Sequence, residues 1–206
     1  MGLSAFGSGP DRLDRWVADT AAAHRSGWAD HLTHSTMVAG TSGAGLVVVG
    51  LVAVAAVVLL RAYRAALVAG VAYVLAVVSA DLLKEVFERS RPPSDVALIG
   101  VPGYSFPSTH AAGTSAVVVG LAVLLLLRPV PGLTPVLPYR AQAVLLLVLA
   151  AAVALVGLGM VYLGAHWLTD VLAGWLLGAL IGSTAGWVGA RTGPTAGRRV
   201  LAPDRA

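Results

Sequence analysis

The sequence predicts an all-α protein, a polytopic transmembrane helix bundle with about five spans and an N-terminal interfacial amphipathic helix. Hydrophobic residues make up 57% of the 206 residues and charged residues only 12%, about half the charged fraction of a typical soluble domain. The apolar residues gather in runs of about 20, which is long enough to cross a bilayer as helices. We expect one membrane domain over residues 1–206, made of an interfacial segment (1–35), a transmembrane core (36–190) and a polar tail (191–206).

The N-terminal segment, residues 11–35, mixes acidic, basic and apolar side chains. Leu13, Trp16 and Val17 have the i, i+3, i+4 spacing that places them on one side of a helix, and tryptophan commonly anchors helices at a membrane surface. Because the segment carries too many charges to span a bilayer, we expect it to lie in the interface. Residues 1–10 lack the positively charged start and the apolar core of a signal peptide.

Five apolar runs follow, and each predicts a membrane-spanning helix. They cover about 37–60, 65–84, 111–127, 141–163 and 167–190. With five spans the connectors alternate between the two sides, and one side collects arginines with a single acidic residue. These residues are Arg61, Arg64, Arg128, Arg140, Arg191, Arg198, Arg199 and Arg205, with Asp204.

The arginine-rich side predicts the orientation, because basic residues concentrate on the cytoplasmic side of membrane proteins. We therefore expect a multi-pass protein of the plasma (inner) membrane, with residues 84–110 on its extracytoplasmic face. The net charge of +4 and the pI of about 10.0 follow from this arrangement, so we expect no nucleic-acid partner. The absence of cysteine excludes disulfides and cysteine-based metal sites. His24, His31 and His34 form no metal motif and are expected at the surface.

The polar stretch from 84 to 110 reads KEVFERSRPPSDVALIGVPGYSFPSTH. Lys84 and Arg91 are seven residues apart and would share one face of a helix, which the following Pro-Pro pair would end. Ser108 can cap the next helix, whose first backbone N–H groups are then directed outward. Cations beside a helix N-terminus form a site for an anion such as phosphate. The alternative is an ordinary basic loop at the membrane surface.

A second polar group opens the last apolar run. His166 and Asp170 are at i and i+4, one above the other on a helix. Asp170 can accept a hydrogen bond from one imidazole nitrogen and leave the other as a basic nucleophile. Ionisable residues at a span usually have a function, although a structural hydrogen bond that closes the helix end is the alternative.

Taken together, these groups resemble the motifs of the type 2 phosphatidic acid phosphatase (PAP2) superfamily. Its pattern is a Lys, six residues and Arg-Pro; then Pro-Ser-Gly-His; then Ser-Arg, five residues, His, three residues and Asp. The residues that match are Lys84, Arg91 and Pro92; Pro107, Ser108 and His110; and His166 and Asp170. Thr109 stands in place of the motif glycine. The resemblance covers about residues 11–190.

The resemblance implies the roles of the ionisable residues. His166 would attack phosphorus and form a phosphohistidine that Asp170 orients and stabilises. His110 would protonate the leaving oxygen and then activate the water that resolves the intermediate.

The resemblance also implies how phosphate is held. Lys84, Arg91, Ser108 and the backbone at Thr109 would bind the phosphoryl oxygens and offset charge in the transition state. Because these fixed cations replace the usual metal ion, the resemblance implies no metal and no other cofactor.

One departure from the pattern bears on activity. Gly159 and Met160 stand where the third motif has Ser-Arg, so one phosphate-binding arginine is absent. Arg89 is near enough in sequence to be an additional phosphate-binding residue, or it is a solvated interfacial charge.

The function implied is hydrolysis of a lipid phosphate or pyrophosphate at the bilayer. Polyprenyl pyrophosphate, phosphatidic acid, phosphatidylglycerol phosphate and a polyprenyl-phosphosugar phosphate all remain open as substrates. A phosphotransferase of the same family, or a catalytically impaired scaffold that binds lipid phosphate because Met160 replaces the arginine, are the alternatives. Gly174, Gly178 and Gly182 recur every four residues, which favours close helix packing within the bundle or between protomers of a homo-oligomer.

Overall fold

The structure, a computed structural model, describes residues 10–41, 51, 54–55, 57–59, 61–127 and 138–192. The main elements of this part of the chain are helices, and no strand occurs in it. In chain order they are α1 (Arg12–Ala23), α2 (Gly27–Thr41), α4 (Tyr63–Phe87), α5 (Thr109–Leu127), α6 (Tyr139–Tyr162) and α7 (Leu168–Arg191). The all-α prediction is confirmed.

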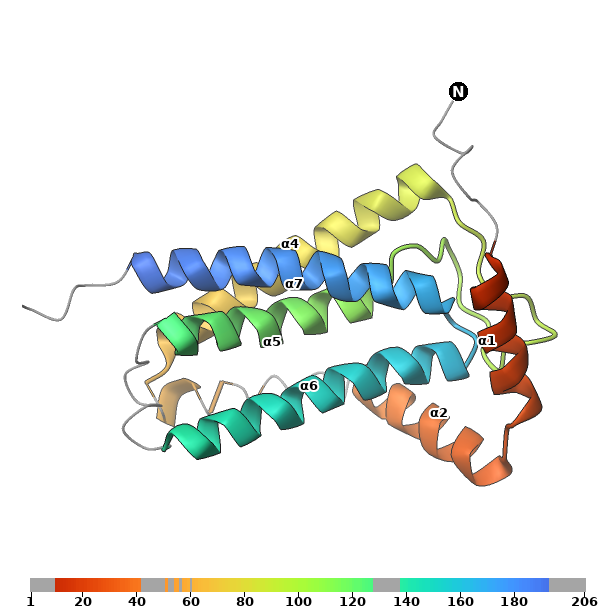
Figure 1. Cartoon of the computed structure of the whole chain (residues 1–206), viewed down its shortest axis with the longest axis horizontal. Coiled ribbons are helices and arrows are strands. Elements are labelled where there is room, and N and C mark those ends of the chain that lie inside the picture. Colours follow the sequence, from red (N-terminus) through yellow and green to blue (C-terminus); the bar gives the residue numbers. More distant parts are fainter. Residues whose placement is uncertain are drawn as a thin grey trace, which may run out of the picture.

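Helices α4, α5, α6 and α7 are long and apolar enough to cross a membrane. They run side by side along the long axis of the molecule (Figure 1). The predicted runs 65–84, 111–127, 141–163 and 167–190 match them to within three residues at each end. The first predicted run, 37–60, lies largely outside the described residues.

The centre of the bundle is the contact between α5 and α7, which small residues make possible. A Cβ atom added at Gly178 would lie 2.2 Å from the carbonyl oxygen of Ala112, and one at Gly182 would lie 2.3 Å from that of Ala116. Two helices that approach this closely need small residues at their interface. The glycines noted in the sequence therefore serve packing within the bundle.

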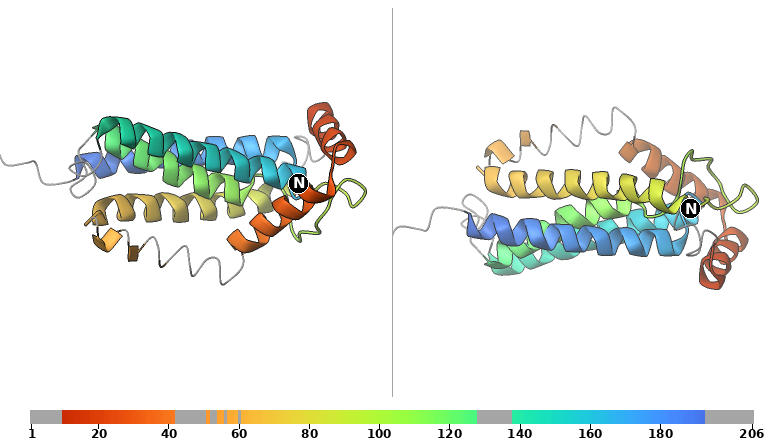
Figure 2. Two further views of the ribbon diagram at one scale, coloured as in Figure 1. Left: turned by 90° about the horizontal axis from the view of Figure 1, so that it is seen from below. Right: turned by 90° about the horizontal axis from the view of Figure 1, so that it is seen from above.

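Helix α4 covers one side of this pair through alanines. Ala72, Ala76 and Ala80 are fully buried against Ala112 and Ala116 of α5. α5 and α7 lie between α4 and α6 (Figure 2). This packing places the C-terminal end of α4 beside the N-terminal ends of α5 and α7, so the polar residues at all three ends meet.

The interfacial segment contains two helices where the sequence predicted one. α1 ends at the cap residue His24, and the side chain of Arg25 then donates hydrogen bonds to the carbonyl oxygens of Val96 (2.6 Å) and Tyr162 (3.0 Å). These distant contacts hold the corner between α1 and α2. α1 lies across the end of the bundle where α7 begins (Figure 1). It exposes Leu13 and Trp16 and buries Asp14.

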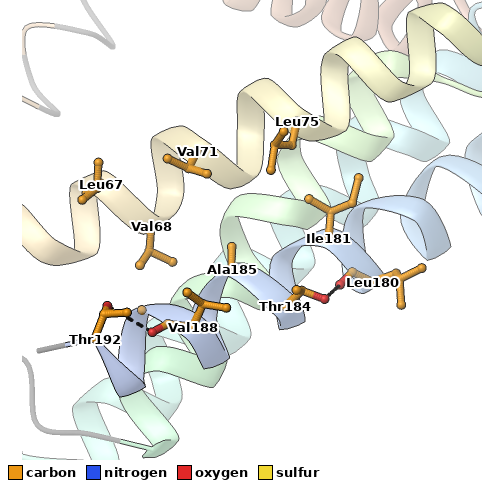
Figure 3. A pocket seen from close by; sticks show the side chains of 11 residues that line it. Leu67, Val68, Val71, Leu75, Leu180, Ile181, Thr184, Ala185, Val188 and Thr192 are labelled. Atoms are coloured by element: carbon orange, nitrogen blue, oxygen red, sulfur yellow. Dashed lines mark hydrogen bonds between the residues drawn. The ribbon is translucent and has the colours of Figure 1, made fainter.

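An apolar groove of about 570 Å³ lies at the other end of the bundle, between α4 and α7 (Figure 3). Val68, Leu75, Ile181 and Val188 are among the residues that line it. Its lining carries no ionisable side chain, so this groove offers no group for acid–base catalysis.

Candidate active site

A cavity of about 430 Å³ lies where the polar ends of the helices meet. Five of the site residues predicted from the sequence line it, together with apolar residues and a part of α2. The lining residues are His34, Met37, Asp81, Lys84, Arg91, Ile99, Val101, Thr109, His110, Met160, Leu163, Ala165 and His166. The cavity therefore has a polar, cationic part and an apolar part.

His166 lies at the turn between α6 and α7, with its side chain 5% exposed. Its Nδ1 atom is 3.5 Å from Oδ2 of Asp170, and its Nε2 atom is 3.3 Å from Nη1 of Arg91. A guanidinium has only donors, so Nε2 accepts at this contact and the ring proton lies on Nδ1, toward Asp170. The lone pair on Nε2 thus points toward Arg91, which lines the cavity together with His166.

The surroundings of His166 keep it uncharged. Burial lowers its pKa, and the charge of Arg91 lowers it further, so the pKa stays below 6.5 although the Asp170 carboxylate acts in the opposite direction. Asp170 is itself fixed at the first turn of α7, where its Oδ2 atom accepts a hydrogen bond from the backbone N–H of Trp167 at 2.9 Å. At neutral pH the site presents a neutral imidazole backed by an oriented carboxylate.

Two cations line the cavity, and each is held by neighbouring groups. Arg91 donates from Nη1 to the carbonyl oxygen of Ala165 (2.7 Å) and from Nε to that of Gly103 (3.0 Å). Lys84 donates to the hydroxyl of Thr109 and lies 3.4 Å from Oδ1 of Asp81. The guanidinium and the ammonium are thereby held at the cavity wall.

Thr109, which replaces the motif glycine, adds a contact that glycine could not make. Its hydroxyl accepts from Lys84 and donates to Asp81 at 2.9 Å. Ser108 lies behind it, fully buried, where its Oγ atom accepts from the backbone N–H of Ala111 at 3.4 Å in the first turn of α5. Ser108 thus occupies the predicted capping position and does not line the cavity.

Arg89 differs from both sequence interpretations. Its side chain is 8% exposed, and it donates from Nη1 to Oδ1 of Asp170 (2.5 Å) and to Oγ1 of Thr169 (2.7 Å). Its Nη2 atom pairs with Asp14. Arg89 is therefore neither solvated nor among the residues that line the cavity. Two buried carboxylates, Asp14 and Asp170, engage it instead.

Comparison with known proteins agrees with the motifs. Residues 65–192, more than half of the chain, match the PAP2 superfamily. The chain belongs to the PAP2 superfamily. This confirms the family inferred from the sequence.

Two curated PAP2 relatives match part of the chain. Phosphatidylglycerophosphatase B of Bacillus subtilis (strain 168) is 36% identical over 101 residues, which cover 48% of this chain and 46% of the relative. Undecaprenyl-diphosphatase of Sulfolobus acidocaldarius is 34% identical over 116 residues, which cover 54% and 48%. The matches thus span about half the length of each relative.

The fold also matches a solved PAP2 structure. This is the crystal structure of a transmembrane PAP2 type phosphatidylglycerolphosphate phosphatase from Bacillus subtilis, with a TM-score of 0.70 over 85% of this chain and 83% of that one. The identity of 24% makes this a likeness of fold. With four apolar helices in the described residues, the chain is a membrane protein of the PAP2 fold.

The departure from the PAP2 pattern at Met160 lies in the cavity wall. Met160 is 6% exposed and lines the cavity with Met37 and His34 from α2. A Cβ atom at Gly159 would lie 2.7 Å from the terminal methyl of Met37, so α2 packs on α6 where the motif has Ser-Arg. His34 is exposed, as the sequence predicted, but the sequence interpretation did not place it in the cavity wall. Only its spacing from Met37 hinted that both lie on one face of α2.

Proposed function

We propose that this protein is a membrane phosphatase that hydrolyses a lipid phosphate or pyrophosphate through a phosphohistidine on His166. One observation carries the proposal. His166 lines a cavity together with Lys84, Arg91 and His110, and its Nε2 atom lies 3.3 Å from Arg91 while Nδ1 faces Asp170. A neutral nucleophile, a second imidazole and two cations are the groups that phosphoryl transfer requires.

In the first step, Nε2 of His166 attacks phosphorus. The new P–N bond forms as the P–O bond to the lipid breaks, and His110 gives its proton to the leaving oxygen. Asp170 stabilises the positive charge that develops on the imidazole. For a pyrophosphate the leaving group is the lipid monophosphate.

In the second step, water displaces His166 from phosphorus. His110, now neutral, takes a proton from the water as its oxygen attacks phosphorus, and the P–N bond breaks to release inorganic phosphate. Lys84 and Arg91 offset the charge on the phosphoryl oxygens in both steps. We propose that these side chains suffice without a metal ion or another cofactor.

The position of the cavity supports a lipid substrate. It lies at the end of the bundle that α1 and α2 cover, and these helices expose the large apolar side chains of Leu13, Trp16, Trp28 and Leu32. Such side chains favour a place at headgroup depth, where a lipid phosphate reaches the cavity from the bilayer. The two curated relatives, a phosphatidylglycerophosphatase and an undecaprenyl-diphosphatase, are named for lipid phosphates.

The arginine distribution supports a site on the extracytoplasmic face of the plasma membrane. Arg61, Arg64 and Arg191 lie at the end of the bundle opposite the cavity, beside the start of α4 and the end of α7. The positive-inside tendency places that end in the cytoplasm.

Release of inorganic phosphate from a panel of lipid phosphates in detergent tests the proposal. Polyprenyl pyrophosphate, phosphatidic acid and phosphatidylglycerol phosphate are compared for the unmodified protein and for His166→Ala. We expect release by the unmodified protein and none above background by the variant. If His166→Ala kept more than about a tenth of the phosphate release of the unmodified protein, the assignment of His166 as the nucleophile would be contradicted.

A catalytically impaired scaffold is the second candidate, because Met160 lines the cavity in place of the motif arginine. Binding of a lipid phosphate without phosphate release by any member of the panel would favour it. Turnover at about 1 s⁻¹ or faster, the low end of ordinary enzyme rates, would exclude it.

A further inference from the structure

Helix α1 carries one buried carboxylate, and it belongs to Asp14. The Oδ1 atom of Asp14 accepts a hydrogen bond from the backbone N–H of Thr169 at 2.9 Å, and Oδ2 accepts from the Thr169 hydroxyl at 2.6 Å. Oδ2 also accepts from Nη2 of Arg89. Asp14 is 155 residues from Thr169 along the chain, and no sequence motif includes it.

The contacts continue from Asp14 to the candidate nucleophile. Arg89 joins Asp14 to Oδ1 of Asp170, and the other oxygen of Asp170 faces Nδ1 of His166. The side chains of Asp14 and Asp170 are both fully buried. Buried charges cost free energy unless they are paired and hydrogen-bonded. The contacts of Arg89 with Asp14 and Asp170 therefore fix the positions of these three side chains.

The ionisation of Asp14 fits this arrangement. Burial alone would raise its pKa, but hydrogen bonds from Thr169 and Arg89 and the charge of Arg89 outweigh burial and lower the pKa below the ordinary 3.8. Asp14 is therefore charged at neutral pH. Its stabilising contribution is complete above pH 3.8 and is lost as the pH falls through the lower folded value.

We propose that Asp14 is a positioning residue for catalysis, which acts through Arg89 and Thr169 on Asp170. This inference deepens the proposed function and depends on His166 as nucleophile. Arg89 fixes the direction of the Asp170 carboxylate, but by itself it would cancel the charge that His166 needs opposite Nδ1. Asp14 restores this negative charge, because Asp14, Arg89 and Asp170 together carry one net negative charge. The membrane-surface helix α1 thus becomes part of the catalytic apparatus.

Charge-changing variants test this directly. Asp14→Asn leaves a net charge of zero on the trio of Asp14, Arg89 and Asp170 and should lower the pKa of His166. Arg89→Gln leaves two negative charges and should raise it. The double variant returns to one negative charge and should restore a value near that of the unmodified protein. Opposite shifts that cancel are not expected from loosened packing. Asp19→Asn, an exposed carboxylate on the same helix, is the matched control and should change nothing.

The pKa of His166 can be followed without turnover. Diethyl pyrocarbonate reacts with neutral imidazole, and mass spectrometry of the peptides gives its rate at His166 across pH. The groups that face His166 are Asp170 of α7, Arg91 of the connector, Lys84 of α4 and His110 of α5. All of them stay unchanged in every variant, so a shift is assigned to the trio. Exposed His24 is the internal reference.

Turnover gives the second readout. We expect Asp14→Asn to lower kcat about tenfold to a hundredfold with little change in KM, and Asp14→Glu, which keeps the charge, to recover part of the loss. If Asp14→Asn does not fold, the double variant, which removes both charges of the Asp14–Arg89 pair, is compared with Arg89→Gln alone.

Each result is decisive. Equal His166 titration in Asp14→Asn and Asp19→Asn, or in Arg89→Gln and the double variant, would overturn the positioning role. The titration test remains valid if no lipid phosphate is hydrolysed, in which case the proposed function fails and the charge coupling is still measured. Normal turnover and titration in Asp14→Asn would overturn the inference while leaving the proposed function intact.

Discussion

At the scale of single residues, the proposed mechanism gives two imidazoles, those of His166 and His110, different tasks. The contact between Arg91 and Nε2 places the proton of His166 on Nδ1, toward Asp170. The motif predicted which residues meet, and the structure adds the direction of each ring nitrogen. That direction comes from Arg91, whose guanidinium is held by the carbonyl oxygens of Ala165 and Gly103.

The lowered pKa of His166 predicts an acid-tolerant enzyme. In the proposed mechanism only neutral His166 can attack phosphorus, and its pKa lies below 6.5 because of burial. We expect kcat/KM to be maintained as the pH falls through 6.5 and to decline only below that value. A profile of kcat/KM against pH checks this, and a decline that begins above 6.5 would contradict it.

Met160→Arg tests the departure from the family pattern. Met160 lines the cavity with an apolar thioether, and arginine there would bring a third cation to the phosphoryl oxygens. We expect kcat on a lipid phosphate to rise by about tenfold or more with little change in KM. Met160→Leu, similar in size and uncharged, should leave kcat nearly unchanged. A fall in kcat for Met160→Arg would show instead that the cavity is fitted to the thioether.

At the scale of elements, the four long helices were predictable because burial in a bilayer requires long apolar runs. The end of the α1 helix was not, because Arg25 bonds to Val96 and Tyr162 much later in the chain. The ion pair of Arg89 with Asp14 was unpredictable for a similar reason, since the two residues are 75 positions apart in the sequence. Predictions thus succeeded where neighbours in sequence or a known motif decide the structure, and failed where distant polar contacts do.

Gly178→Ala tests the close packing of α7 on α5. The added Cβ atom would lie 2.2 Å from the carbonyl oxygen of Ala112, so the helices must separate. We expect a loss of about 1–3 kcal/mol, typical of overpacking, seen as a lower Tm in detergent. Gly70→Ala, where the new atom meets nothing within 4 Å, is the control. Equal Tm values for both variants would contradict the tight α5–α7 contact.

At the scale of the whole molecule, the cavity lies at one end of the bundle, and Arg61, Arg64 and Arg191 lie at the other. The cavity and helices α1 and α2 occupy one end, and the start of α4 and the end of α7 occupy the other (Figure 1). The helices between them expose leucines such as Leu147 and Leu176, as lipid contact requires. The molecule is thus polarised along the axis that crosses the membrane.

Cysteine labelling tests this orientation. Because the sequence contains no native cysteine, only the introduced thiol can react. Ser94 lies at the cavity end and Thr192 follows α7 at the other end, and both are exposed. We expect a membrane-impermeant thiol reagent to label Ser94→Cys in intact cells and Thr192→Cys only after lysis. The reverse pattern would place the cavity in the cytoplasm.

The most direct measurement of the central claim is detection of the phosphoryl group on His166. The unmodified protein is allowed to turn over a lipid phosphate in the presence of a metal chelator. It is then quenched in alkali, in which phosphohistidine survives, and its peptides are analysed by mass spectrometry. The account predicts phosphate on the peptide that contains His166, and undiminished turnover in chelator. Turnover that leaves His166 unmodified, or that stops in chelator and returns with a divalent metal ion, would contradict it.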